Sequence, residues 1–298
     1  MYKVPSVIKL CVVAAMIAAL PVISARAEVG VVIPPSGLPI SYIFQIIVDE
    51  GEPVGWTWTV HHVGNPSYVT LNDQGLANGD HDPSLIMRSE YGFPIAAWAA
   101  STPQGYDVVV SRFDGTAWLP VQIVADSPAD ELDPYLVFNP DDDSVHLLYW
   151  INDGAPRVMH RQASSELSSW STPVQVSQTG DIACRPSGTF HDGVLHISYE
   201  VHDFGLGSAP RQIVHATQNG QTFFWEIVAT TQFPDSNWPR IHSADERLWI
   251  DWIDGEEDMA WTRRLAAGPW ESIQTEHFET TEQRDFHIRG VIRIHALE

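Results

Sequence analysis

The sequence predicts an all-β protein, a five-bladed β-propeller whose closing blade is split between N-terminal strands and a C-terminal strand. Three observations support this prediction. Aromatic and proline residues recur with a period of roughly 50 residues, each period holds four short β-rich segments separated by turns, and no helical periodicity of any length follows residue 28. With 298 residues, of which 44% are hydrophobic, the chain is long enough to bury such a core.

Three sets of residues recur in phase along the chain. An aromatic residue opens a short β-rich run at Tyr68, Trp118, Trp170, Trp225 and Trp270, with spacings of 50, 52, 55 and 45 residues. A buried apolar strand ends in an aromatic at Trp98, Trp150, Tyr199 and Trp252, and a proline marks a strand start at Pro83, Pro134, Pro186 and Pro239. We expect the large flat rings to fill the space between neighbouring twisted sheets rather than to bind a ligand.

The repeats divide the chain into blades. Four complete blades are expected at about 81–126, 131–178, 183–231 and 236–278. Segments 41–49, 56–62 and 67–71 would supply three strands of the fifth blade, and the tail Arg284–Leu297 resembles its missing first strand. Joining both ends of the chain in one sheet would close the ring and remove its exposed edges.

The N-terminus carries a targeting signal. Lys3 and Lys9 accompany a nearly apolar run from Leu10 to Ile23, and Ala25-Arg26-Ala27 is a small-x-small cleavage site. The apolar run is shorter than the roughly 20 residues that span a bilayer. We therefore expect a secretory signal peptide at 1–27, an N-terminal arm at 28–40 and a single propeller domain at 41–298. A retained membrane anchor is the alternative, and membrane contact is expected only in that case; the expected location is the periplasm or the exterior of a bacterial cell.

Composition excludes several function classes. The chain has 38 acidic and 16 basic residues and a formal net charge of −22, which argues against nucleic acid as a partner because phosphate neutralisation needs Lys and Arg. Two cysteines cannot form a disulfide scaffold. The 13 histidines are scattered without metal-ligand spacing, and no Gly-rich phosphate loop occurs. The run Asp141–Asp143 could hold Ca²⁺, but a solvated turn is favoured there, so no metal and no cofactor is predicted.

Two repeats start with Asp-Pro, at Asp82-Pro83-Ser-Leu and Asp133-Pro134-Tyr-Leu. These starts, each followed by an apolar strand, resemble the five-bladed glycoside hydrolases of the arabinanase and xylosidase type. The resemblance implies that Asp82 is a general base and that Asp133 tunes the acid. The Glu-Gly-Pro start of that family's general acid is not found, since the corresponding starts are Arg185-Pro186 and Trp238-Pro239. Glu200, beside the end of an apolar strand, is the remaining candidate for the acid.

A second resemblance concerns the segment from Ser111 to Trp118. Its Ser-Arg-Phe-Asp-Gly-Thr-Ala-Trp sequence is similar to the Asp-box turn of sialidase-like propellers, with the Asp one place late. Arg185 and Arg284 resemble the arginines with which such enzymes hold a sialic acid carboxylate. This resemblance implies that the two arginines bind a ligand.

The candidate site lies on one face of the ring. In a propeller, the starts of the inner strands surround the axis, and the loops between second and third strands share that face; polar groups converging there with an aromatic form a typical binding site. The expected ligand-binding residues are His81, Arg185, His202, Asp203, Trp238, Arg284 and Asp285, while Asp82, Asp133 and Glu200 would be catalytic only in an enzyme. The loops add Asn152, Asp153, Arg157, Arg211, Asp254 and Asp258, and segment 201–210 is the best candidate for a lid.

Each of these assignments has a structural alternative. An Asp before Pro often accepts backbone N–H bonds in a turn. Arg185 and Arg284 would then pair with the aspartates, because carboxylates buried near the axis need partners. Trp238 could plug the axial channel instead of stacking on a sugar.

Two functions therefore stand beside each other. The leading one is an exported, non-catalytic binding propeller that recognises a glycan or a partner protein of the cell envelope through its axial face, since the motif of the catalytic Glu is missing. The alternative is a glycosidase-like or sialidase-like hydrolase, whose chemistry needs carboxylates on either side of a sugar. The propeller fold itself does not decide between them.

Overall fold

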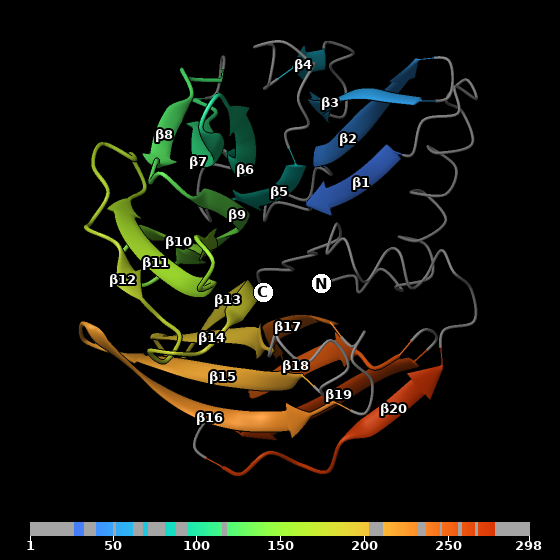
Figure 1. Ribbon diagram of the computed structural model, residues 1–298, viewed down its shortest axis with the longest axis vertical. Helices are drawn as coiled ribbons and strands as arrows, with labels where there is room; N and C mark the ends of the chain where they lie inside the picture. The colour runs from blue at the N-terminus through green and yellow to red at the C-terminus, as the bar shows by residue number, and fades with distance from the viewer. Residues whose placement is uncertain are drawn as a thin grey trace, which may run out of the picture.

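A computed structural model of the chain shows an all-β protein built from antiparallel sheets (Figure 1). The structure describes residues 27–32, 40–49, 52–61, 68–70, 81–87, 94–114, 118–202, 211–231, 237–244, 246–255, 258–265 and 268–277. Within these ranges, no helix has the length and apolar character that crossing a membrane requires.

The described residues form five four-stranded sheets, each with its strands in chain order. The first holds β1 (Ala27–Val32), β2 (Ile40–Asp49), β3 (Glu52–His61) and β4 (Tyr68–Thr70). The second holds β5 (His81–Met87), β6 (Pro94–Thr102), β7 (Gly105–Arg112) and β8 (Gln122–Ala125). The third holds β9 (Asp130–Asn139), β10 (Ser144–Asn152), β11 (Arg157–Ser164) and β12 (Val174–Gln175). The fourth holds β13 (Ala183–His191), β14 (Val194–Val201), β15 (Gln212–Asn219) and β16 (Thr222–Thr230), and the fifth β17 (Asn237–Ala244), β18 (Arg247–Ile253), β19 (Asp258–Leu265) and β20 (Gln274–His277).

The sheets follow one another around a common centre (Figure 1). The first strands of consecutive sheets are in contact, β5 with β9, β9 with β13 and β13 with β17, so these four strands are the inner ones. The sheet boundaries agree with the four complete repeats expected from the sequence, and the all-β, propeller-like arrangement is confirmed.

The N-terminal sheet differs from the expectation of a split blade. The strand that pairs with β2 at the edge of this sheet is β1, Ala27–Val32, whereas the sequence suggested the C-terminal tail for this position. The tail itself, Arg284–Leu297, lies outside the described residues. The segment expected as an N-terminal arm contains most of β1. The physical reason is proximity in the chain, because closing the short connection from β1 to β2 costs far less loop entropy than recruiting a strand from the other terminus.

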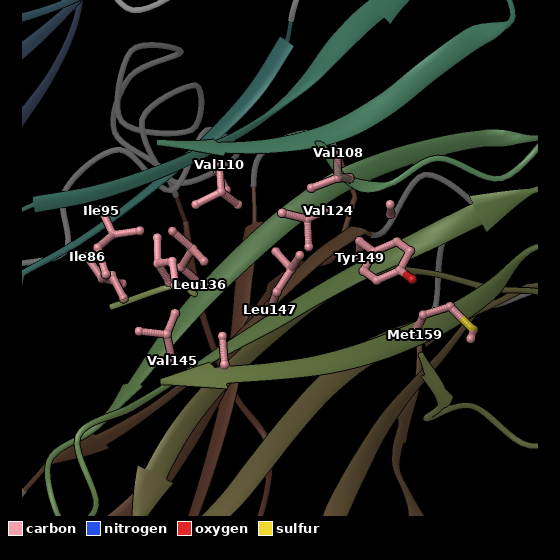
Figure 2. Packing of buried hydrophobic residues seen from close by; sticks show 14 of the residues in the cluster. Ile86, Ile95, Val108, Val110, Val124, Leu136, Val145, Leu147, Tyr149 and Met159 are labelled. Carbon is pink, nitrogen blue, oxygen red and sulfur yellow. The ribbon is translucent and has the colours of Figure 1, made fainter. Parts of the chain in front are cut away.

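Apolar side chains pack between neighbouring sheets. Val108 and Val110 lie on the same face of β7 and pack with Leu136 of β9 and Leu147 of β10 in the third sheet, as Figure 2 shows. Each of these four residues is at most 1% exposed. Trp170 and Trp270 pack against such clusters as expected, being partly buried. Trp225 does not pack like the other tryptophans that open a repeat, because it lies on the outer strand β16 with 41% of its surface exposed.

Buried histidines pair in equivalent places of two neighbouring sheets. His146 Nδ1 shares a hydrogen bond of 2.9 Å with His160 Nε2 between β10 and β11. His196 Nδ1 does the same with His215 Nε2 at 2.9 Å between β14 and β15. Each pair is nearly parallel, with interplanar angles of 21° and 14°. Four of the histidines that are scattered in the sequence are thus structural, and each has a ring nitrogen that is hydrogen-bonded inside the protein.

Gly188 offers a test of the contact between the third and fourth sheets. A Cβ at this buried position would lie 2.8 Å from Leu148 Cδ1 and 2.9 Å from Val137 Cγ2. Gly188→Ala should therefore lower the free energy of unfolding by about 1–3 kcal/mol through overpacking, as measured by urea denaturation. Gly268→Ala is the control, because its Cβ would meet nothing closer than 3.6 Å. Equal stabilities for the two variants would contradict the packing seen here.

The buried imidazoles also predict acid sensitivity. Burial lowers the pKa of His146 to about 4 and the pKa values of His160 and His196 to about 3, from 6.5. Their neutral forms stabilise the fold fully above pH 6.5, and this contribution is lost as the pH falls toward 4, because the unfolded chain then binds more protons. Burial acts in the opposite sense on two carboxyl groups, raising the pKa of Asp251 to about 7 and that of Glu131 to about 6.

A single substitution isolates the histidine contribution. His160→Gln should reduce the loss of unfolding free energy between about pH 6.5 and about pH 5 by roughly 2 kcal/mol, measured by urea denaturation at both pH values. His277→Gln on the surface, where 63% of the side chain is exposed, should keep the wild-type loss. An unchanged loss in His160→Gln would show that this imidazole does not titrate between the folded and unfolded states as argued.

Candidate functional site

A cavity of about 370 Å³ lies where the inner strands of the third, fourth and fifth sheets begin. Its wall combines two indoles, two guanidinium groups, one carboxylate, a thiol and an imidazole. The lining residues are Leu132, Asp133, Trp150, Cys184, Arg185, His202, Arg211 and Trp238. They come from β9, β10, β13 and β17, with His202 directly after β14 and Arg211 directly before β15.

The residue before each strand-start proline has an unusual backbone conformation. Asp133, Arg185 and Trp238 have positive φ angles of 48°, 55° and 63°, in the left-handed region that non-glycine residues rarely adopt. At each of them the ladder shifts, so that two residues of the inner strand oppose one residue of its neighbour. Proline has no N–H to give to the ladder, which makes it suited to such a bulge. The bulges bring all three side chains to the cavity.

The same register places Asp82 in the equivalent position of the second sheet. His81 pairs with Ala99 and Ser84 with Ala97, so Asp82 and Pro83 together oppose Trp98. The structure describes His81 and Asp82 by strand position only. Both sequence-predicted residues therefore lie at the start of an inner strand, as expected.

In the third and fourth sheets, a residue of the second strand forms a hydrogen bond with the bulge residue of the first strand. Trp150 Nε1 donates a hydrogen bond of 2.6 Å to Asp133 Oδ2. In the next sheet, Arg185 Nη1 donates to Glu200 Oε1 at 2.8 Å. Trp150 pairs with Leu132 and Glu200 pairs with Cys184, so the two partners occupy the same register position. The same backbone arrangement therefore supports an indole–carboxylate hydrogen bond in the third sheet and a guanidinium–carboxylate ion pair in the fourth.

Glu200 is the counter-ion of two arginines. Its side chain is completely buried and its Oε1 accepts from Arg185 at 2.8 Å and from Arg211 at 3.2 Å. Glu200 is not among the residues that line the cavity. A general acid has to reach the oxygen of the leaving group, so this position speaks against the acid role that the hydrolase alternative assigned to Glu200. Arg185 therefore has Glu200 as a hydrogen-bonded counter-ion, and its expected pairing with an aspartate stays a prediction.

Trp238 forms cation–π contacts with two arginines. The guanidinium carbon of Arg185 lies 4.4 Å from the centre of the indole, and that of Arg240 lies 5.9 Å from it. Such cation–π contacts place the guanidinium over the negative face of the ring. Arg185 is therefore oriented from two sides, by Glu200 and by Trp238.

Cys184 and His202 both line the cavity and are in contact with each other. Cys184 Sγ lies 3.1 Å from His202 Nε2 and 3.2 Å from Glu200 Oε1. Burial raises the pKa of the Cys184 thiol well above its usual value, and the Glu200 charge adds to this effect. Burial also lowers the pKa of His202. Without a metal, the sulfur is therefore a protonated thiol and not a nucleophilic thiolate.

The structure brings together five of the residues predicted for the site, namely Asp133, Arg185, His202, Arg211 and Trp238. Asp203, Arg284 and Asp285 lie outside the described residues. Three other loop candidates are engaged in ion pairs and do not line the cavity, since Asp153 pairs with Arg157 at 2.7 Å and Asp258 with His277 at 3.0 Å. In the Asp141–Asp143 turn, Asp142 accepts the backbone N–H of Ser144 at 3.0 Å, a contact typical of a turn.

Sequence reasoning missed three residues of the cavity lining, Leu132, Cys184 and Trp150, and Trp150 is the one that the repeat misplaced. The repeat had placed it in the buried aromatic column, but the register gives that place to Tyr149, which opposes the bulge as Tyr199 and Trp252 do. Tyr149 is 1% exposed, and its neighbour Trp150 is displaced toward the cavity. The adjacent aromatic pair Tyr149-Trp150 is the signal that could have revealed this, because neighbouring strand residues face opposite sides.

No protein-family model matches the sequence, and no curated protein does. Solved structures share the fold at low identity. An ulvan lyase, a polysaccharide lyase bound to -[GlcA(1-4)Rha3S]-, has a TM-score of 0.59 and 14% identity over 85% of this chain and 71% of that one. The intramolecular trans-sialidase from Ruminococcus gnavus has a TM-score of 0.51 and 10% identity over 66% and 70%.

A Hadza microbial sialidase is similar as well, with a TM-score of 0.55 and 14% identity over 81% of this chain. The chain spans 55% of that sialidase. These likenesses concern the fold alone and support the resemblance to sialidase-like propellers at that level, while the resemblance to arabinanases stays a prediction. The protein therefore shares a propeller-type β fold with sialidases and with a polysaccharide lyase.

Proposed function

We propose that this protein is an exported, five-bladed β-propeller that binds a glycan in its axial cavity without cleaving it. The observation that carries this proposal is the lining of the cavity, in which Trp150 and Trp238 stand beside Arg185, Arg211 and Asp133. Aromatic faces with a few convergent donors and acceptors suit a sugar, which has an apolar ring face and polar hydroxyl groups. The propeller ring would close where the N-terminal sheet meets β17.

The size of the cavity agrees with a short piece of glycan. A volume of about 370 Å³ lies at the lower end of small-molecule sites, enough for one or two sugar residues. The guanidinium groups can donate to hydroxyl or carboxylate oxygens, and Asp133 can accept from hydroxyl groups. The names of similar structures, sialidase and ulvan lyase, support carbohydrate as the ligand class.

Binding without catalysis is favoured by the placement of the carboxylates. Glycoside hydrolysis uses two carboxyl groups that flank the bond to be cleaved. Among the described residues, Asp133 is the one carboxylate that lines the cavity, and Glu200 lies behind the arginines. A hydrolase that uses Asp133 and Asp82 is the second candidate, supported by the shared bulge position of these two residues.

A glycan array with purified protein tests the proposal, followed by titration calorimetry on the best ligand. Trp238→Ala should weaken binding by about tenfold or more, because it removes one aromatic wall of the cavity and the stacking partner of Arg185. Arg211→Lys should weaken it as well, since an ammonium keeps the charge beside Glu200 but loses the planar donor fork.

Matched controls lie on the outer part of the fifth sheet. Arg263 repeats the chemistry of Arg185, because its Nε donates to Glu271 at 2.8 Å and its guanidinium lies 4.7 Å from the Trp249 ring. Arg263→Ala and Trp261→Ala should leave affinity unchanged. Cleavage of a bound glycan would favour the hydrolase, whereas no glycan binding together with capture of one envelope protein would replace the glycan by a protein partner.

A further inference from the structure

Two side chains of the cavity wall, Cys184 and His202, and their buried neighbour Glu200 are of the kinds that bind metal ions. Cys184 on β13 stands directly opposite Glu200 on β14, and His202 follows the end of β14. Cys184 Sγ is 3.2 Å from Glu200 Oε1 and 3.1 Å from His202 Nε2. One ligand atom from each residue lies within 4.8 Å of the other two, so a single ion could reach all three.

The donor set indicates which ion. Sulfur and imidazole nitrogen with one carboxylate oxygen are the ligands that zinc takes, whereas calcium and magnesium prefer oxygen alone. We propose that Cys184, Glu200 and His202 form a three-ligand zinc site whose fourth coordination position opens into the axial cavity. The opening follows from the lining, because Cys184 and His202 both form part of the cavity wall.

A second, independent observation comes from the other carboxylate oxygen. Glu200 Oε1 carries the contacts with Arg185 and Arg211, while Oε2 is buried without a hydrogen-bond partner among the described residues. A buried carboxylate oxygen without a partner is costly. A cation would satisfy Oε2 and leave both arginine contacts on Oε1 in place.

The local charge tolerates a divalent ion despite the two arginines. Glu200, Asp133 and a metal-bound Cys184 thiolate are three negative groups, against the positive Arg185 and Arg211. Binding requires that the Cys184 thiol release its proton to solvent, after which the sulfur donates an electron pair to the metal. The S–H bond of Cys184 is the one bond that breaks, its electron pair stays on the sulfur, and no oxidation or reduction takes place.

The site is independent of the glycan proposal, since it can be tested with the metal alone. Purified full-length protein is stripped with a chelator, dialysed against Zn²⁺ and assayed for bound metal, and Co²⁺ serves as a spectroscopic probe. We expect one equivalent of Zn²⁺, and with Co²⁺ a thiolate-to-cobalt charge-transfer band. Absence of the metal after dialysis, or a cobalt spectrum without that band, would overturn the proposal.

Cys184 is the one cysteine of the chain outside the expected signal peptide, so its substitution tests the thiolate ligand. Cys184→Ser should abolish the charge-transfer band and weaken zinc binding roughly 100-fold or more, whereas Arg263→Ala on the fifth sheet should retain both. Zinc binding by Cys184→Ser at wild-type affinity would refute the site.

His202→Gln tests the second ligand, with the exposed His277→Gln as its control. Zinc should raise the melting temperature of the wild type and of both controls, but not of Cys184→Ser or His202→Gln. If Cys184→Ser fails to fold, the wild-type stoichiometry and His202→Gln decide the question. Glu200→Gln is less informative, because it also removes the charge that Arg185 and Arg211 share.

Discussion

The bulge before each strand-start proline positions the charged residues around the cavity. Proline cannot donate to the ladder, and the residue before it turns into the left-handed region at Asp133, Arg185 and Trp238. Each such residue costs roughly 1–3 kcal/mol of backbone strain. A buried aromatic opposes the bulge in every one of these sheets, namely Tyr149, Tyr199 and Trp252, and its packing helps to hold the strained backbone.

The site arises because a repeated backbone carries different side chains. Asp133 with Trp150 and Arg185 with Glu200 occupy equivalent positions in neighbouring sheets, and Trp238 stands at the third such bulge. A ring of identical side chains would place like charges together near the axis. The alternation of acid, base and aromatic instead lets each buried charge meet a partner, which offsets the cost of taking it out of water.

Polar groups between the sheets follow the same logic farther from the cavity. Ser84 Oγ accepts the backbone N–H of Leu136 at 2.9 Å, and Ser187 Oγ accepts that of Ile241 at 2.9 Å, so one hydroxyl bridges each of two pairs of neighbouring sheets. In each histidine pair, one nitrogen of each ring is satisfied by the other ring within a single sheet. These contacts connect the sheets with specific geometry and keep the inner strands, and hence the cavity, in a defined arrangement.

Strand boundaries and the prolines at the bulges were readable from the sequence, because turn residues, β-branched runs and proline act through local backbone chemistry. The site residues Asp133, Arg185, His202 and Trp238 followed from that repeat, and the structure places them together. Tertiary structure alone decided the rest. The choice of Tyr149 over Trp150 for the core depends on a one-residue register shift, the burial of Glu200 depends on two arginines from separate strands, and the strand beside β2 depends on loop entropy. Such outcomes are set by competition between distant segments for the same position, and no local sequence pattern records which segment wins.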